Sequence, residues 1–301
     1  MTIQTVQPSQ RQLWLAALKP PMYSVAIMPI WVGSAIAFFQ SQTINWRIFF
    51  TFLTASILIL VWENLCNDVF DSETGIDKNK HHSLVNLTQN KSLIFWIANL
   101  CLALALSEIM VISWWQQDLT VLGLVLIGCF IAYSYQGPPF RLGYQGLGEI
   151  LCFFAFGPLE VGAAYYSQTQ TWSTLNLGTI ATSAIVGIAT TLILFCSHFH
   201  QTEDDLAAGK RSPIVRLGTE KAAKLLPYLS GSIFVLTALF VALGIFPLWT
   251  LLSFAGLPFA IKLCRQVGTY YNEPEKLANC KFIAVGLHFL TGSLLGLGFM
   301  L

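Results

Sequence analysis

The chain has 301 residues, of which 55% are hydrophobic and only 10% are charged, and its formal net charge is +1. A soluble protein carries roughly 25% charged residues, so this composition and a mean hydropathy of +0.63 exclude a soluble globular domain. The seven cysteines are scattered and form no C-x-x-C pair, which argues against a disulfide framework or a cysteine metal site. We therefore predict one all-α, polytopic membrane domain spanning residues 1–301.

Hydrophobic segments long enough to cross a bilayer recur along the whole chain. About 20 apolar residues are needed for one transmembrane helix. On this measure the sequence contains about nine spans, at approximately 20–39, 47–68, 92–114, 119–136, 147–166, 176–199, 222–245, 247–265 and 280–300. The polar segment 1–11 lacks the short apolar core and cleavage site of a removable signal peptide.

The basic residues are distributed asymmetrically between the two ends of these spans. With the N-terminus in the cytoplasm, 15 of the 16 lysine and arginine residues fall on the cytoplasmic side, and Arg47 is the exception. The long polar connections 69–91, 137–146, 200–221 and 266–279 fall on the same side. We expect an integral protein of a plasma or thylakoid membrane, with its functional site facing the cytoplasm.

The first acidic motif follows directly from the second apolar segment. On a helix, Asn64, Asp68 and Asp71 lie at i, i+4 and i+7 and so share one face, with Asn67 beside them. A glycine at position 75 is expected to end the helix before Asp77. This arrangement predicts a cation site where a membrane helix meets water.

The second acidic motif lies at the same end of another predicted span. If the helix continues, His198, Gln201 and Asp205 share a face, Asp204 lies beside them, and Glu203 points away. The two motifs are expected at one depth, facing each other across the bundle. Oxygen ligands of this type suit Mg²⁺, which takes one or two carboxylates together with substrate phosphates and water.

The alternative is that these acids are ordinary solvated charges in loops. This reading applies best to single residues such as Asp71, Glu73 or Glu203. A carboxylate within the membrane costs up to about 3 kcal/mol at the helix centre and persists mainly where it pairs or binds something. Asp68 and Asp205 are the strongest candidates because each also belongs to a shared polar face.

A third motif connects the fourth and fifth predicted spans. Its paired prolines and several glycines predict a rigid loop after Tyr133 and Tyr135. Arg141 in this loop can fork onto phosphate oxygens, or it can be a simple positive anchor of the membrane topology. Further positive charge near the site is available from Lys78, Lys80, Lys210 and Arg211.

Four glutamates fall within predicted spans. Glu63 lies in the second span, and Glu108 lies in the third, where it is expected near the outer surface. Glu149 and Glu160 are 11 residues apart, about three helical turns, so we expect both to face the bundle interior.

The three motifs together resemble the UbiA superfamily of intramembrane aromatic prenyltransferases. The resemblance rests on Asn67-Asp68-x-x-Asp71, on the loop from Arg141 through Gly-Tyr-Gln-Gly-Leu-Gly to Glu149, and on Glu203-Asp204-Asp205-x-x-x-Gly-Lys-Arg. It extends over nearly the whole chain. The loop and the Gly-Lys-Arg-Ser-Pro-Ile-Val-Arg-Leu-Gly segment resemble the branch that prenylates 1,4-dihydroxy-2-naphthoate in phylloquinone and menaquinone synthesis.

This resemblance implies a helix bundle around a lipid-open cavity, in which Mg²⁺ holds a prenyl diphosphate. The implied metal ligands are Asn64, Asp68, Asp71, Asp77, Gln201, Glu203, Asp204 and Asp205. The implied catalytic residues are Asp68, Asp71, Asp205 and Arg141. The implied substrate-binding residues are Asn64, Asn67, Lys78, Tyr133, Tyr135, Glu149, His198, Gln201 and Lys210. The chain departs from the family at Gln201, where many members have an aspartate, so one charge is missing from the second motif.

The implied reaction transfers a prenyl group to 1,4-dihydroxy-2-naphthoate with loss of CO₂ and pyrophosphate. We expect a phytyl donor, because the stretch from His198 to Asp205 resembles photosynthetic members. The alternatives are another aromatic acceptor such as homogentisate, or a cation-coupled transporter, although transporters place such acids near the membrane centre. The expected partners are the two substrates and membrane lipid, with no nucleic acid and no obligate protein partner.

Overall fold

The computed structural model describes residues 9–74, 76, 83–172 and 177–301, and within these ranges it contains helices and no strand. The predicted site residues Asp77 and Lys78 lie outside the described residues. The first half of the chain forms α1 (Gln10–Leu18), η1 (Pro20–Tyr23), α2 (Ser24–Ser41), α3 (Trp46–Thr74), α4 (Leu84–Thr88), α5 (Lys91–Gln116) and α6 (Thr120–Gln136). The second half forms α7 (Gly148–Phe154), η3 (Ala155–Val161), α8 (Gly162–Thr169), α9 (Leu177–His200), α10 (Thr202–Ala207), α11 (Pro213–Leu217), α12 (Thr219–Ala242), η4 (Leu248–Gly256), α13 (Leu257–Tyr270), η5 (Pro274–Leu277) and α14 (Cys280–Met300).

Each predicted span corresponds to a helical segment. Within the described ranges, eight segments are long and apolar enough to cross a membrane, and α6 is a shorter apolar helix of 17 residues. The prediction of a polytopic helical membrane protein with about nine spans is thus confirmed.

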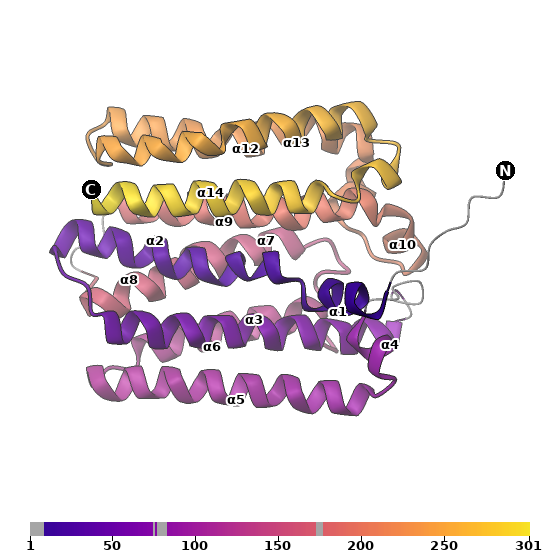
Figure 1. Cartoon of the computed structure of the whole chain (residues 1–301), viewed down its shortest axis with the longest axis horizontal. Coiled ribbons are helices and arrows are strands. Elements are labelled where there is room, and N and C mark those ends of the chain that lie inside the picture. Colours follow the sequence, from indigo (N-terminus) through magenta and orange to yellow (C-terminus); the bar gives the residue numbers. More distant parts are fainter. Residues whose placement is uncertain (1–8, 75, 77–82, 173–176) are drawn as a thin grey trace.

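The long helices lie side by side along one axis (Figure 1). The pair α12 and α13 forms one edge of the bundle, and α5 forms the opposite edge. Both edges expose large apolar side chains, among them Leu100 and Met110 on α5 and Val235 on α12. Outward-facing apolar surface of this extent is stable in lipid and would be unfavourable in water, which identifies an integral membrane protein.

The buried side chains form two clusters. One is centred on α2, α9, α12 and α14 and includes Leu192, Ile233 and Leu287. The other is centred on α3, α5 and α6 and includes Phe52 and Ile109. The short elements α1, α4 and α10 gather at one end of the bundle, opposite the C-terminus (Figure 1).

Local structure departs from regular α-helix at two places that matter for the site. The span 147–166 contains the π-helical turn η3 around Pro158, because proline cannot donate the backbone hydrogen bond that a regular helix needs. The helix of the second motif ends at His200, Gln201 forms a bend, and α10 begins at Thr202. The second motif is therefore not one continuous helix.

Candidate active site

One cavity of about 910 Å³ joins the two acidic motifs to an apolar interior. Its walls include residues of α2, α3, α6, α7, η3, α9 and the start of α14. Both halves of the chain therefore contribute to the cavity. Ten of the predicted site residues line it: Asn64, Asn67, Asp68, Asp71, Tyr135, His198, Gln201, Asp204, Asp205 and Lys210. The lining also includes apolar side chains such as Leu60, Val125, Phe156 and Ile193.

The first motif lies on one continuous helix. Asn64, Asp68 and Asp71 all line the cavity from α3, as the helical spacing predicts. The carboxylate of Asp68 is 2% exposed and accepts a hydrogen bond from the backbone N–H of Leu84, with 2.9 Å between N and Oδ2. This bond attaches α4 to the acidic end of α3.

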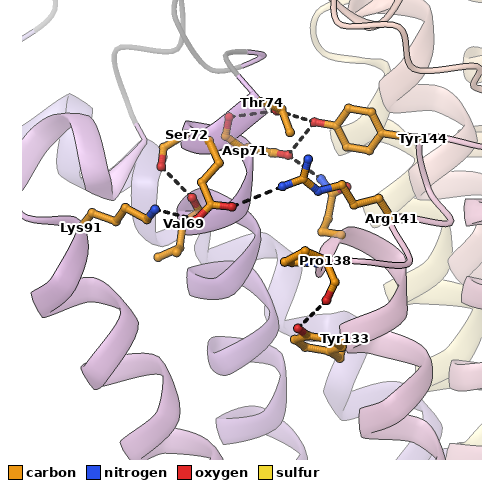
Figure 2. Close-up of polar contacts among 11 residues, drawn as sticks. Val69, Asp71, Ser72, Thr74, Lys91, Tyr133, Pro138, Arg141 and Tyr144 are labelled. Atoms are coloured by element: carbon orange, nitrogen blue, oxygen red, sulfur yellow. Dashed lines mark hydrogen bonds and ion pairs between the residues drawn. The ribbon is translucent and has the colours of Figure 1, made fainter.

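Asp71 is held by two neutral donors from other elements. Gln136 Nε2, at the end of α6, lies 2.7 Å from Asp71 Oδ1, and the hydroxyl of Tyr144 lies 3.2 Å from the same oxygen. Figure 2 shows Tyr144 pointing from its loop toward Asp71 and Thr74. Burial, and then the negative charge of Asp71, raise the pKa of Tyr144, so its phenol keeps the proton that it donates.

The second motif holds its carboxylate with charged and titratable partners. Asp205 Oδ2 lies 2.8 Å from His198 Nδ1, and Asp205 Oδ1 lies 3.5 Å from Lys210 Nζ. Burial by itself raises the pKa of Asp205, but the hydrogen bond from His198 and the charge of Lys210 outweigh burial and lower it. The other ring nitrogen of His198 lies 3.5 Å from Glu149 Oε1, which ties α7 to this cluster.

Some predicted site residues lie outside the cavity wall. Arg141 pairs with Glu73, with 3.2 Å between Nη2 and Oε2, and Glu73 also pairs with Lys91 at 2.6 Å (Figure 2). Tyr133 donates its hydroxyl to the carbonyl of Pro138 at 2.7 Å. The pair with Glu73 fastens the loop 137–147 to the end of α3, and the bond from Tyr133 fastens it to α6.

The remaining acids are distributed between the interior and the surface. Glu203 is exposed on α10 and is absent from the cavity wall. Glu160 lines the cavity and is hydrogen-bonded to Ser56, and Glu63 lines it from α3. Glu108 lies away from the cavity and accepts a hydrogen bond from Thr54 at 2.8 Å.

Gln136 and Tyr144 are the residues that the sequence reasoning did not select. Tyr144 is part of the loop motif on which the family resemblance rests, but no role was assigned to it, and Gln136 had no sequence signal. Both act on Asp71 from elements more than 60 residues away along the chain, with separations of 65 and 73 residues.

The donor set at the acidic end fits a hard divalent cation. Its candidate ligands are carboxylate and amide oxygens, which suit Mg²⁺. Among the described residues, no group of three or more His, Cys, Asp or Glu side chains can hold a metal ion by itself. A magnesium ion here would therefore draw further oxygen ligands from water or from a substrate phosphate.

Comparison with known proteins agrees with this geometry. The chain is 53% identical over 292 residues to the 2-carboxy-1,4-naphthoquinone phytyltransferase of Synechocystis, covering 97% of this chain and 94% of that protein. It is 40% identical over 302 residues to the chloroplastic enzyme of that name from Arabidopsis thaliana, covering 98% and 78%. It is also 29% identical over 273 residues to the 1,4-dihydroxy-2-naphthoate octaprenyltransferase of Escherichia coli, covering 87% and 86%.

The fold is similar to that of solved membrane proteins. A UbiA homolog from Archaeoglobus fulgidus superposes with a TM-score of 0.63 at 16% identity, covering 94% of this chain and 99% of that one. The same homolog bound to GPP and Mg²⁺ superposes with a TM-score of 0.60 at 15% identity, covering 94% and 99%. The sequence profile of the UbiA prenyltransferase family matches residues 26–289. This chain therefore belongs to the UbiA prenyltransferase family.

Proposed function

We propose that the protein transfers a phytyl group from phytyl diphosphate to 1,4-dihydroxy-2-naphthoate, with release of CO₂ and pyrophosphate. The observation that carries this proposal is the single cavity in which two acidic motifs meet an apolar interior. A diphosphate needs the polar end, and an isoprenoid chain needs the apolar part, since each buried CH₂ contributes about 0.8 kcal/mol. The names of the relatives at 53% and 40% identity support the same reaction class.

The diphosphate is assigned to the acidic end of the cavity. The UbiA homolog that binds GPP together with Mg²⁺ supports this assignment. The residues that would hold magnesium line the cavity: Asn64, Asp68, Asp71, Gln201, Asp204 and Asp205. Asp77, outside the described residues, and Glu203, which is exposed on α10, stay predictions. When bound, the metal supplies positive charge that neutralises the diphosphate as it leaves.

Basic side chains of the chain itself assist this departure. Lys19, Lys210 and Lys281 line the cavity, and Lys210, which lies 3.5 Å from Asp205 of the second motif, is the one that we expect to contact a phosphate oxygen. Arg141 and Lys78 stay predictions, since Arg141 lies outside the cavity wall and Lys78 outside the described residues. Tyr135 lines the cavity, where its ring face can stabilise an allylic cation.

The bonds and electrons of the proposed step balance. The C–O bond of the prenyl donor breaks, and its electron pair leaves with pyrophosphate. The ring carbon that carries the carboxylate attacks the allylic carbon and forms the new C–C bond. The C–CO₂ bond then breaks, and its electron pair restores the aromatic ring as CO₂ departs. His198 and Glu149 are proposed to contact the substrates near this point, beside Asp205.

The names of the relatives differ in the oxidation state of the acceptor. The proteins at 53% and 40% identity are named for the quinone form of the acceptor, and the protein at 29% identity is named for the hydroquinone form. We favour the hydroquinone, because an allylic cation is attacked by an electron-rich ring.

We assign the acidic end to the cytoplasmic side of a plasma or thylakoid membrane, because the lysines and arginines gather in the connections at this end.

A donor-by-acceptor activity matrix tests this proposal. Purified protein with Mg²⁺ is offered phytyl, geranylgeranyl or octaprenyl diphosphate, each with 1,4-dihydroxy-2-naphthoate, its quinone, homogentisate or 4-hydroxybenzoate. We expect the phytylated, decarboxylated naphthoquinol as the main product by mass spectrometry. Turnover of homogentisate with no reaction of either naphthalene acceptor would disprove the proposed acceptor. Better use of octaprenyl diphosphate would disprove the proposed donor.

A further inference from the structure

Tyr144 contacts the first acidic motif and the segment that follows the second one. Its hydroxyl lies 3.2 Å from Asp71 Oδ1 and 2.6 Å from Thr74 Oγ1, both on α3. Its ring lies 5.9 Å from Lys210 Nζ, measured from the ring centroid. Its backbone carbonyl accepts a hydrogen bond of 2.8 Å from the N–H of Arg211. The side chain and the backbone carbonyl of Tyr144 thus join the end of α3 to the segment that follows Asp205.

The loop around Tyr144 is packed tightly against that second segment. Gly146 has a φ of +77°, and a Cβ there would collide with the carbonyl oxygen of Arg211. The guanidinium of Arg216 bonds to the carbonyl of Gln145. These contacts fix the backbone of Tyr144 relative to the second motif, so the position of its hydroxyl is set by that motif.

The hydroxyl of Tyr144 acts on a carboxylate that has another fixed donor. Gln136 Nε2 bonds to the same Oδ1 of Asp71, at 2.7 Å, and Gln136 is only 4% exposed. Two donors that converge on one oxygen from different directions restrict rotation of the carboxylate group. Tyr144 itself is absent from the cavity wall, so it reaches a substrate only through the groups that it holds.

We propose that Tyr144 is a positioning residue that couples the two acidic motifs, with its hydroxyl orienting Asp71 and its ring and carbonyl holding the Lys210–Arg211 segment. This role rests on the proposed function, in which Asp71 holds a metal ion and Lys210 contacts the diphosphate. Groups that orient metal ligands typically change metal affinity by about tenfold to hundredfold when they are removed. The coupling sets the distance between the two sides of the diphosphate site.

Binding of Mn²⁺ provides a test that requires no turnover. Mn²⁺ is titrated into purified protein with a non-reactive prenyl thiolodiphosphate, and the free ion is followed by electron paramagnetic resonance. For Tyr144→Phe, which removes only the hydroxyl, we expect the dissociation constant of Mn²⁺ to rise about tenfold to hundredfold. In an Asp71→Asn background the same change should add no further rise, because the hydroxyl acts through Asp71.

Tyr166→Phe is the matched control. Tyr166 also donates its hydroxyl to an aspartate, Asp118, at 2.7 Å, but neither residue lines the cavity. We expect this variant to bind Mn²⁺ like the wild type. Equal losses in the two Tyr→Phe variants, or normal binding in Tyr144→Phe, would overturn the proposal. If Tyr144→Phe does not fold, Gln136→Leu removes the other donor to Asp71 Oδ1, and normal Mn²⁺ binding in that variant overturns the proposal equally.

Hydrogen exchange of the metal-free protein separates this inference from the proposed reaction. In Tyr144→Leu, which also removes the ring beside Lys210, amides of 205–212 should exchange at least about threefold faster, while those of α12 stay unchanged. Unchanged exchange in 205–212 would disprove the coupling. If Tyr144→Leu exchanges faster in 205–212 and the wild-type protein binds no Mn²⁺, the coupling is supported and the metal-dependent reaction is contradicted.

Discussion

Among the described residues, the carboxylates of the two acidic motifs have different kinds of partner. On α3, Asp68 and Asp71 accept hydrogen bonds from neutral groups, the backbone of Leu84 and the side chains of Gln136 and Tyr144. In the second motif, Asp205 lies between His198 and Lys210. The neutral donors orient Asp68 and Asp71, whereas Lys210 also compensates the charge of Asp205.

Gln201 adds to this difference, because a charged ligand at that position would strengthen metal binding and the second motif lacks it. We expect Asp68 and Asp71 of the first motif to bind the cation, and the second motif to bring a lysine toward the diphosphate. Replacing single residues on each side can break or sharpen this comparison.

Loss of Asp68 should have the largest effect. Asp68→Asn keeps the shape of the side chain but removes one charge from the proposed metal site, so we expect prenyl transfer to fall by about a thousandfold. The amide oxygen can still accept from Leu84, so the contact between α3 and α4 should persist. Glu108→Gln, beside Thr54 and away from the cavity, is the control that should keep full activity. Substantial activity in Asp68→Asn would remove it from the metal site.

Loss of Asp205 should reduce both activity and stability. Asp205→Asn leaves Lys210 buried without its counter-charge, and breaking a buried pair costs about 3 kcal/mol or more. We expect about a hundredfold loss of prenyl transfer and a clearly lower unfolding temperature. The double variant Asp205→Asn with Lys210→Met should recover most of the stability but not the activity. An unfolding temperature equal to that of the wild type would contradict a stabilising pair between Asp205 and Lys210.

Loss of Lys210 alone should act mainly on the diphosphate substrate. Lys210→Met removes one charge-assisted contact, so KM for the prenyl diphosphate should rise about tenfold, with a smaller change in kcat. Steady-state kinetics at saturating Mg²⁺ measures both. Lys224→Met is the control, because Lys224 pairs with Glu220 at 2.7 Å on α12, away from the cavity. The same KM in both variants would exclude a contact between Lys210 and the diphosphate.

Restoring a charge at position 201 should have the smallest effect, and in the opposite direction. Gln201→Asp adds a carboxylate to the weaker side, worth about 1 kcal/mol at contact distance in water, which is about a fivefold change. We expect the Mg²⁺ concentration for half-maximal activity to fall by that factor. Gln201→Asn should leave it unchanged. A higher Mg²⁺ requirement in Gln201→Asp would show that this side does not contact the metal.

The sequence predicted α3 and its functional face well. Residues 56, 60, 63, 64, 67, 68 and 71 all line the cavity, because a helical period of 3.6 places residues three and four apart on one face. The second motif was predicted less completely. The chain bends at Gln201, so His198 and Asp205 lie on two different helices, α9 and α10. The hydrogen bond between their side chains brings them together.

The partners of the predicted residues were not evident from the sequence. Arg141 was expected at a phosphate, and in the structure it pairs with Glu73. Glu149 was expected to face the interior, and it contacts His198 there. Such pairs join elements many residues apart, and local periodicity carries no information about which neighbours meet.

The sequence by itself determined the membrane class, the approximate number of apolar helices, the polar face of α3 and the resemblance to one family. These properties follow from hydrophobic length, helical period and local motifs, all of which are short-range. Only the tertiary structure decided that Gln136 and Tyr144 orient Asp71, that His198 and Lys210 hold Asp205, and that both motifs open into one cavity. These contacts depend on how the helices and the loop 137–147 pack together, which is a property of the whole bundle.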